Sequence, residues 1–273
     1  MDQRMTHGNA IAFTAPLPEW VGLTDTGRAR RGNEDAFALL PEAGIALLAD
    51  GMGGHARGEL ASCLAVSTAL RHLLDHTPTD AALPTTPPGE RLVEAFLAAN
   101  RAILAAAATD PGAAGMGTTL LAILVEGMHL HAAHVGDGRL YRLRAARLEQ
   151  LTCDQTVGQL LASRDDRSAP GPRQGPFSHV LTQALGVEPE LQPQRFDLDC
   201  LPGDLFLLCS DGLHGLVEAE KIRLTLQNFG ANLGGAASEL IRLANERGGR
   251  DNITVVLVRP AIATTAATQV RTV

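Results

Sequence analysis

Residues 45–55, Ile-Ala-Leu-Leu-Ala-Asp-Gly-Met-Gly-Gly-His, join a short apolar run to an aspartate and a glycine-rich loop. The apolar run has the length of a buried strand, and the glycines after Asp50 allow the backbone to turn sharply. Apolar residues then recur at helical spacing over residues 57–76. This stretch predicts a strand that ends at Asp50, a glycine-rich loop and a long helix.

Further strands and helices are predicted on both sides of this unit. Apolar runs predict strands at residues 21–25, 37–40, 205–209 and 254–258, and amphipathic patterns predict helices at residues 91–108 and 236–247. Residues 118–125, 128–135 and 139–144 read as three strands joined by tight turns at Glu126-Gly127 and Asp137-Gly138. Such a meander is antiparallel, which argues against a doubly wound parallel sheet and favours layered α and β structure in one domain.

Composition excludes several classes of function. The chain has 273 residues and a formal net charge of -7, so a broad basic surface for nucleic acid is absent. Lys221 is its single lysine and follows Glu220 at the start of a polar helical pattern, so Schiff-base chemistry and Walker-type phosphate binding both lack their lysine. The sequence holds neither an uninterrupted apolar run of about 18 residues nor a basic leader, so we expect neither membrane spanning nor export.

The cysteines point to a reducing environment. Cys63, Cys153, Cys200 and Cys209 lack CxxC spacing and stand beside apolar or small residues. This pattern is typical of buried free thiols rather than of metal ligands or disulfides. We therefore expect a cytoplasmic protein.

Acidic residues recur beside glycine or asparagine next to the predicted strands. They occur in Asn33-Glu34-Asp35, Asp50-Gly51, Ser210-Asp211-Gly212 and Asp251-Asn252. One Asp-Gly pair alone is most often a simple turn. Several carboxylates that converge would repel one another unless cations neutralise them, and hard oxygen ligands suit Mg2+ or Mn2+. The repetition therefore predicts a metal centre assembled from distant segments.

These segments resemble, in order, the motifs of the type 2C family of metal-dependent serine/threonine protein phosphatases. Residues 30–35 (RRGNED) resemble its first motif, and residues 50–55 (DGMGGH) resemble the bacterial form of its second. Later similarities lie at residues 117–119, 135–139, 181–186, 210–213 and 251–256. The resemblance covers residues 21–258, and its specificity comes from many motifs in sequence rather than from any one of them.

The resemblance implies a four-layer α-β-β-α sandwich, in which helices flank two central antiparallel sheets. It places the phosphatase domain at residues 21–260, between an irregular extension, residues 1–20, and a tail, residues 261–273. It implies a monomeric enzyme that hydrolyses phosphoserine and phosphothreonine on proteins with metal-activated water. A bacterial serine/threonine kinase would be its opposing partner.

The resemblance also implies a set of metal ligands around two Mn2+ or Mg2+ ions. Asp50 would bridge both ions and the Gly51 carbonyl would bind one of them. Asp211 and Asp251 would complete one ion. The remaining implied ligands are Glu34 and Asp35 for the other ion, directly or through water, and Asp137 for a third, weaker cation.

Four further residues have implied roles outside direct metal binding. Arg30 would grip the phosphate, because a planar guanidinium matches two phosphate oxygens at once. His55 would protonate the departing serine or threonine alkoxide. Asn33 and Asn252 would support the ligands.

The sequence departs from the family at two places. Gly138 stands where the family usually has serine, which weakens the assignment of Asp137, and Asp137-Gly138 is also a good hairpin turn. Residues 154–179 match poorly, and in the family this segment forms a flap beside the active site. We expect residues 163–176 to form an exposed, mobile loop.

Two alternative functions remain open from sequence. His129, His131 and His134 form an HxHxxH pattern similar to that of zinc hydrolases, but Ala133 stands where those enzymes carry aspartate. A non-catalytic phosphoprotein-binding module of the same fold is the second alternative, and the intact acidic positions argue against it. A nucleotide loop is disfavoured because neither GxGxxG nor a P-loop is present.

Overall fold

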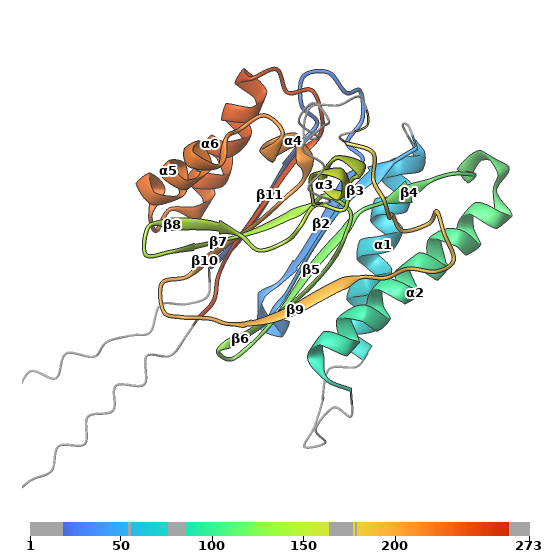
Figure 1. Cartoon of the computed structure of the whole chain (residues 1–273), viewed down its shortest axis with the longest axis horizontal. Coiled ribbons are helices and arrows are strands. Elements are labelled where there is room, and N and C mark those ends of the chain that lie inside the picture. Colours follow the sequence, from blue (N-terminus) through green and yellow to red (C-terminus); the bar gives the residue numbers. More distant parts are fainter. Residues whose placement is uncertain (1–18, 54–55, 76–85, 164–176, 178, 262–273) are drawn as a thin grey trace, which may run out of the picture.

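Two antiparallel sheets face each other, and helices cover their outer faces (Figure 1). This computed structural model describes residues 19–53, 56–75, 86–163, 177 and 179–261. The arrangement confirms the predicted four-layer sandwich. The irregular ends and the loop at residues 163–176 that we expected from sequence lie almost entirely outside the described residues.

The first sheet is formed by strands from both ends of the described chain. Its spatial order is β1 (Glu19–Asp25), β11 (Ile253–Arg259), β10 (Leu205–Cys209), β7 (Arg139–Arg144) and β8 (Arg147–Gln150). The second sheet runs β2 (Asp35–Leu40), β3 (Ile45–Met52), β5 (Leu120–Glu126), β6 (His129–Val135) and β9 (Gln194–Asp199), and the short β4 (Gly117–Thr118) pairs with the end of β3.

Helices form the outer layers. The helices α1 (Ala56–Asp75) and α2 (Pro88–Thr109) cover the second sheet, and α4 (Asp211–His214), α5 (Ala219–Phe229) and α6 (Leu233–Glu246) cover the first (Figure 1). The chain also contains α3 (Val157–Ser163) and the 3-10 turns η1 (Pro41–Ala43) and η2 (Pro111–Ala113).

The burial of β3 explains its continuous apolar run. Ile45 and Leu47 pack in the core with α1 and α2, whereas Ala46 and Leu48 pack between the two sheets. Successive side chains of a strand point to opposite faces, so a strand covered on both faces needs apolar residues at every position. β3 continues to Met52, beyond the predicted end, so Asp50 lies within the strand and near its C-terminal end.

The predicted three-strand meander is wrong at its second turn. β5 and β6 form the expected hairpin, but β7 pairs with β10 and β8 in the other sheet. Residues 136–138 therefore carry the chain from one sheet to the other. Gly136 has φ +105, and a Cβ there would collide with the side chain of Thr119, so glycine is required at this crossing.

Several elements differ from the sequence-based expectation. β1 begins at Glu19, inside the segment that we expected to be irregular. The edge strands β8 and β9 were not predicted, because their sequences Arg-Leu-Glu-Gln and Gln-Arg-Phe-Asp-Leu-Asp are mostly polar. Cys63 and Cys153 are exposed, contrary to the expected burial, and only Cys200 and Cys209 are buried among these free thiols.

α2 is long and apolar enough, by length and composition, to cross a membrane. Leu92, Phe96 and Ile103 of this helix are fully buried in the core that β3 and α1 also form. Its apolar face is therefore used in packing within the domain.

Candidate active site

Five of the predicted acidic residues line one cavity of about 650 Å3. They come from the segment before β2, from β3, from the crossing between the sheets, from α4 and from the segment before β11. These residues are Glu34, Asp50, Asp137, Asp211 and Asp251, and Arg30 lines the same cavity. Residues that are up to 217 positions apart in the chain thus meet at one end of the sandwich.

The backbone of Asp50 is fixed by the segment that follows β4. Its amide donates to Thr119 Oγ1 at 3.0 Å, and its carbonyl accepts from the Thr119 amide and from Thr118 Oγ1, both at 2.9 Å. The side chain is therefore presented to the cavity from a rigid strand.

Gly51 occupies a space that no other residue fits. Its amide donates to the Glu34 carbonyl at 3.1 Å, and a Cβ at this position would collide with the Gly58 carbonyl. Gly58 lies in the first turns of α1, and a Cβ there would collide with the Glu34 carboxylate. The two glycines bring β3, α1 and Glu34 into close contact.

Asp35 lies beneath the cavity and does not line it, which differs from a direct ligand role. Its Oδ2 accepts hydrogen bonds from Ser210 Oγ at 2.8 Å and from Thr254 Oγ1 at 2.6 Å. Its Oδ1 is buried without a hydrogen-bond partner, and burial raises its pKa to about 7. Asp35 pairs with Asp50 in the β2–β3 register, so the two residues are direct neighbours across this strand pair.

The clustered carboxylates are buried and their negative charges repel one another, which raises the pKa values of these groups. Burial, followed by repulsion from neighbouring carboxylates, raises the pKa of Asp50 well above its usual value and that of Asp137 to about 7. The pKa of Asp211 is raised by burial and by Asp251. Asp50 also acts on the pKa of Asp211, so these two carboxylates lie close together. A divalent cation between them would offset their repulsion.

The residues fit hydrated divalent cations rather than a closed metal cage. Within the described residues, no three His, Cys, Asp or Glu side chains are arranged to hold a metal ion by themselves. Mg2+ typically keeps several waters and binds through about one or two carboxylates, so carboxylates that do not close around an ion by themselves suit it. The buried Oδ1 of Asp211, which has no hydrogen-bond partner, is an available ligand atom.

Arg30 and Asp251 form an ion pair at the cavity. Arg30 Nη2 donates to Asp251 Oδ2 at 2.7 Å, and the Asn252 amide donates to Asp251 Oδ1 at 2.9 Å. Both carboxylate oxygens therefore have protein partners. The hydrogen bond to Asp251 raises the pKa of Arg30.

Asn252 and Asn33 hold the segment that carries Glu34. Asn252 accepts from the Glu34 amide at 2.8 Å and donates to the carbonyls of Thr26 and Gly32 at 3.0 and 2.9 Å. Asn33 donates to Thr24 Oγ1 at 2.8 Å and accepts from the Asp35 amide at 3.1 Å. Both asparagines thus position backbone, as supporting residues would.

Comparison with known proteins decides the family. Residues 28–242 match the family described as Protein phosphatase 2C. The chain belongs to the protein phosphatase 2C family. The expected resemblance is confirmed, and solved structures of the family share the fold.

Two curated 2C phosphatases and two solved structures illustrate the similarity. PstP, a serine/threonine protein phosphatase of Mycobacterium tuberculosis, is 39% identical over 234 residues, which are 86% of this chain and 43% of PstP. This chain thus spans less than half of that relative. The serine/threonine phosphatase stp of Listeria monocytogenes is 36% identical over 239 residues, which are 86% of this chain and 93% of stp.

A crystal structure of M. tuberculosis PstP is similar with a TM-score of 0.78 and 38% identity, covering 88% of this chain and 97% of that one. A PstP catalytic domain described as a complex with two manganese ions has a TM-score of 0.75 at 38% identity, with coverage of 88% and 97%.

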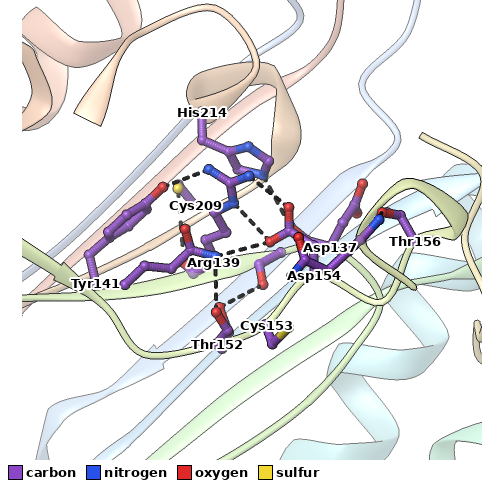
Figure 2. A network of polar contacts seen from close by, with 12 residues as sticks. Asp137, Arg139, Tyr141, Thr152, Cys153, Asp154, Thr156, Cys209 and His214 are labelled. Atoms are coloured by element: carbon purple, nitrogen blue, oxygen red, sulfur yellow. Dashed lines mark hydrogen bonds and ion pairs between the residues drawn. The ribbon is translucent and has the colours of Figure 1, made fainter. Parts of the chain in front are cut away.

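In this member of the 2C family a second cavity, of about 420 Å3, adjoins the carboxylate site and shares Asp137, His179 and Asp211 with it. Figure 2 shows the polar network of this region. Arg139 donates to both carboxylate oxygens of Asp154, at 2.8 and 2.7 Å, and to the Tyr141 hydroxyl at 3.0 Å.

The same network holds the crossing that carries Asp137. His214 of α4 donates through Nε2 to the Asp137 carbonyl at 3.0 Å (Figure 2). Burial lowers the pKa of His214 to about 4, so the imidazole is neutral near pH 7. Sequence reasoning missed Arg139, Asp154 and His214 as parts of the site. The available signal was Arg139 directly after the Gly-Asp-Gly motif.

The three histidines of the zinc alternative do not share a centre. His129 and His131 lie on one face of β6 and contact Asp199 and Asp197 across the strand pair, with N–O distances of 3.0 and 2.7 Å. His134 is buried and donates to the Cys153 carbonyl at 3.0 Å. The structure gives the zinc hypothesis no support. His55 lies outside the described residues.

Proposed function

We propose that this protein hydrolyses phosphoserine and phosphothreonine on proteins, using two Mn2+ or Mg2+ ions held by the carboxylates of the cavity. The observation that carries the proposal is the convergence of Asp50, Asp211 and Glu34 in one cavity of a 2C phosphatase, with the buried Asp211 Oδ1 left without a hydrogen bond. Relatives named serine/threonine phosphatases support the substrate class.

The proposed ligand sets use the residues that line the cavity. Asp50 is the proposed bridge between the two ions, and the Gly51 carbonyl would bind one of them. Asp211 and Asp251 would serve one ion and Glu34 the other. Asp35 would act through a water or by supporting Asp50, and Asp137 would hold a third, weaker cation. When bound, such cations lower the pKa of a coordinated water and offset charge on phosphoryl oxygens.

Arg30 and His55 are the proposed contacts to the substrate. The Arg30 guanidinium can bind two phosphate oxygens, but it must first leave Asp251, with which it pairs at 2.7 Å. Its release also frees Asp251 Oδ2 for a cation. His55 would protonate the leaving alkoxide. An acid of this kind contributes about 10²- to 10⁴-fold, whereas phosphate monoesters can require up to ~10²¹-fold, so charge stabilisation in the cavity has to provide most of the acceleration.

The proposed setting is the cytoplasm of a bacterium, where the protein would act as a monomer and counteract a serine/threonine kinase. The relatives named above are bacterial, which supports this setting.

Phosphate release from a phosphothreonine peptide tests the proposal. We expect turnover by the purified protein with Mn2+ or Mg2+, none in EDTA, and a loss of at least ~10³-fold in Asp211→Ala, because a ligand shared by the reacting centre is removed. Glu42→Ala, an exposed position in η1, is the matched control and should retain full activity. Circular dichroism would verify folding. Absence of phosphate release with every cation would replace the proposal with the phosphoprotein-binding module.

A further inference from the structure

The carboxylate cavity has a second side built by residues 180–191, here called the 180–191 wall. This segment lies between α3 and β9 and passes beside α2 (Figure 1). Val187, Glu188 and Glu190 are exposed members of the cavity lining. The cavity of about 650 Å3 is in the size range of roughly 300–1,000 Å3 that holds a drug-sized ligand, which exceeds one phosphorylated side chain. It has room for neighbouring substrate residues.

A buried asparagine holds the wall in place. Asn100 of α2 is 1% exposed and accepts from the Gly186 amide at 2.7 Å. Its amide nitrogen donates to the carbonyls of Glu188 and Pro189 at 2.9 and 3.3 Å. A side chain with these three bonds fixes the backbone on which Val187 and Glu188 stand.

The wall is also hydrogen-bonded to β4. Thr118 and Leu185 exchange backbone hydrogen bonds of 3.0 and 2.9 Å, and Thr118 Oγ1 donates to the Asp50 carbonyl at 2.9 Å. The wall and the reacting centre therefore share one anchor. A substrate that binds the wall is therefore held at a fixed position relative to the carboxylates.

Met52 and Val187 form an apolar patch of the cavity lining next to Gly117. A Cβ placed on Gly117 would lie 2.7 Å from Met52 Cε and 3.1 Å from Val187 Cγ2, so these two side chains flank the glycine. Met52 directly follows Gly51, and Val187 is 49% exposed. An apolar side chain that covers Val187 removes apolar surface from water, which favours binding.

We propose that the 180–191 wall binds the polypeptide beside the phosphorylated residue. It selects an apolar residue for the Met52–Val187 patch and basic residues for Glu188 and Glu190. This inference rests on the proposed phosphatase function and names the sequence class of its substrates. The occupant follows from continuity with the carboxylate cavity and from the negative charge of the two glutamates.

Two phosphothreonine peptides test this inference, one with valine and arginines beside the phosphothreonine and one with glycine and glutamates in their place. The kcat/KM values are measured together with peptide affinity by fluorescence anisotropy. We expect the first peptide to be favoured about tenfold in both readouts, since two exposed ion pairs and one apolar contact contribute. Glu188→Lys/Glu190→Lys should reverse the preference, and Val187→Ser should reduce it.

Two controls separate this inference from the phosphatase proposal. The double variant Glu42→Lys/Asp75→Lys changes the charge equally at exposed positions outside the cavity and should keep the preference. Hydrolysis of p-nitrophenyl phosphate should be unchanged in every wall variant, because this substrate has no flanking residues. Equal affinities for the two peptides would overturn the inference, whereas failure to hydrolyse either peptide or p-nitrophenyl phosphate would overturn the phosphatase proposal alone.

Discussion

At the scale of single residues, the carboxylates of the site divide into two kinds. Asp50 and Asp211 line the cavity. Asp35 lies beneath it, and one of its carboxylate oxygens accepts hydrogen bonds from two hydroxyl groups. A buried carboxylate that accepts two hydrogen bonds fixes its neighbours in place at the cost of burying charge. Asp35 thus links β2 to β11 and to Ser210, which directly follows β10.

Arg30 provides the prediction at this scale. Arg30→Ala should raise KM for a phosphopeptide about tenfold or more, because a bidentate charged contact is lost. The same variant should bind Mn2+ more tightly in the absence of substrate, because Arg30 then no longer competes for Asp251 Oδ2. Isothermal titration calorimetry measures the second effect. Arg28→Ala, a nearby exposed arginine, is the control, and an unchanged or weaker Mn2+ affinity in Arg30→Ala would contradict the competition.

At the scale of elements, the Arg139–Asp154 pair joins the start of β7 to the segment that leads into α3. The two side chains are 25% and 15% exposed, and their contact is bidentate. Because β7 follows the crossing directly, this pair and His214 determine where Asp137 stands.

Asp154→Ala tests this pair. It should destabilise the protein by ~2 kcal/mol, less than the roughly 3–5 kcal/mol of a fully buried pair, because Arg139 keeps the Tyr141 contact and some access to water. Urea unfolding gives this value. The control is Glu239→Ala, which breaks the Arg242–Glu239 pair on α6, where Arg242 is 51% exposed, and should cost clearly less because water screens this pair. Equal costs for the two variants would show that the Arg139–Asp154 pair contributes no more than a surface contact.

At the scale of the whole molecule, the carboxylate cluster links stability to pH. Asp35 and Asp137 have pKa values of about 7, whereas carboxylates of an unfolded chain titrate near pH 4. The folded, metal-free protein therefore binds more protons than the unfolded chain between these values, and its stability falls as pH rises. His214, with its pKa lowered to about 4, acts in the opposite direction, but only below its ordinary value of 6.5.

Between about pH 6.5 and 8, the change in stability therefore comes from the carboxylates and not from His214. In EDTA we expect Tm to fall by roughly 4 °C or more over this window, since Asp35 and Asp137 together lose about 1.5 kcal/mol and the raised pKa of Asp50 adds to the fall. Saturating Mn2+ should remove most of this fall, and Asp35→Asn should reduce it. Differential scanning fluorimetry provides the measurement. A metal-free Tm that rises with pH would refute the linkage.

The long helices and the acidic motifs could be predicted from sequence because each depends on local pattern, whereas the two-sheet sandwich followed from the resemblance to the family. β3 reads as a strand because both its faces are apolar, and Asp50-Gly51 is recognisable because the backbone there admits only glycine. The family motifs placed five acidic residues that the structure brings to one cavity.

The remaining features depend on contacts between distant segments. Asp137-Gly138 has the composition of a hairpin turn, and only the pairing of β7 with β10 shows that the chain crosses between sheets there. Asn100 looks like any polar position of an amphipathic helix until the Gly186 amide and the Glu188 carbonyl reach it. Local sequence determined which groups could ligate, turn or pack, whereas the tertiary structure decided which of them meet, because burial and hydrogen-bond partners are supplied by segments far away in the chain.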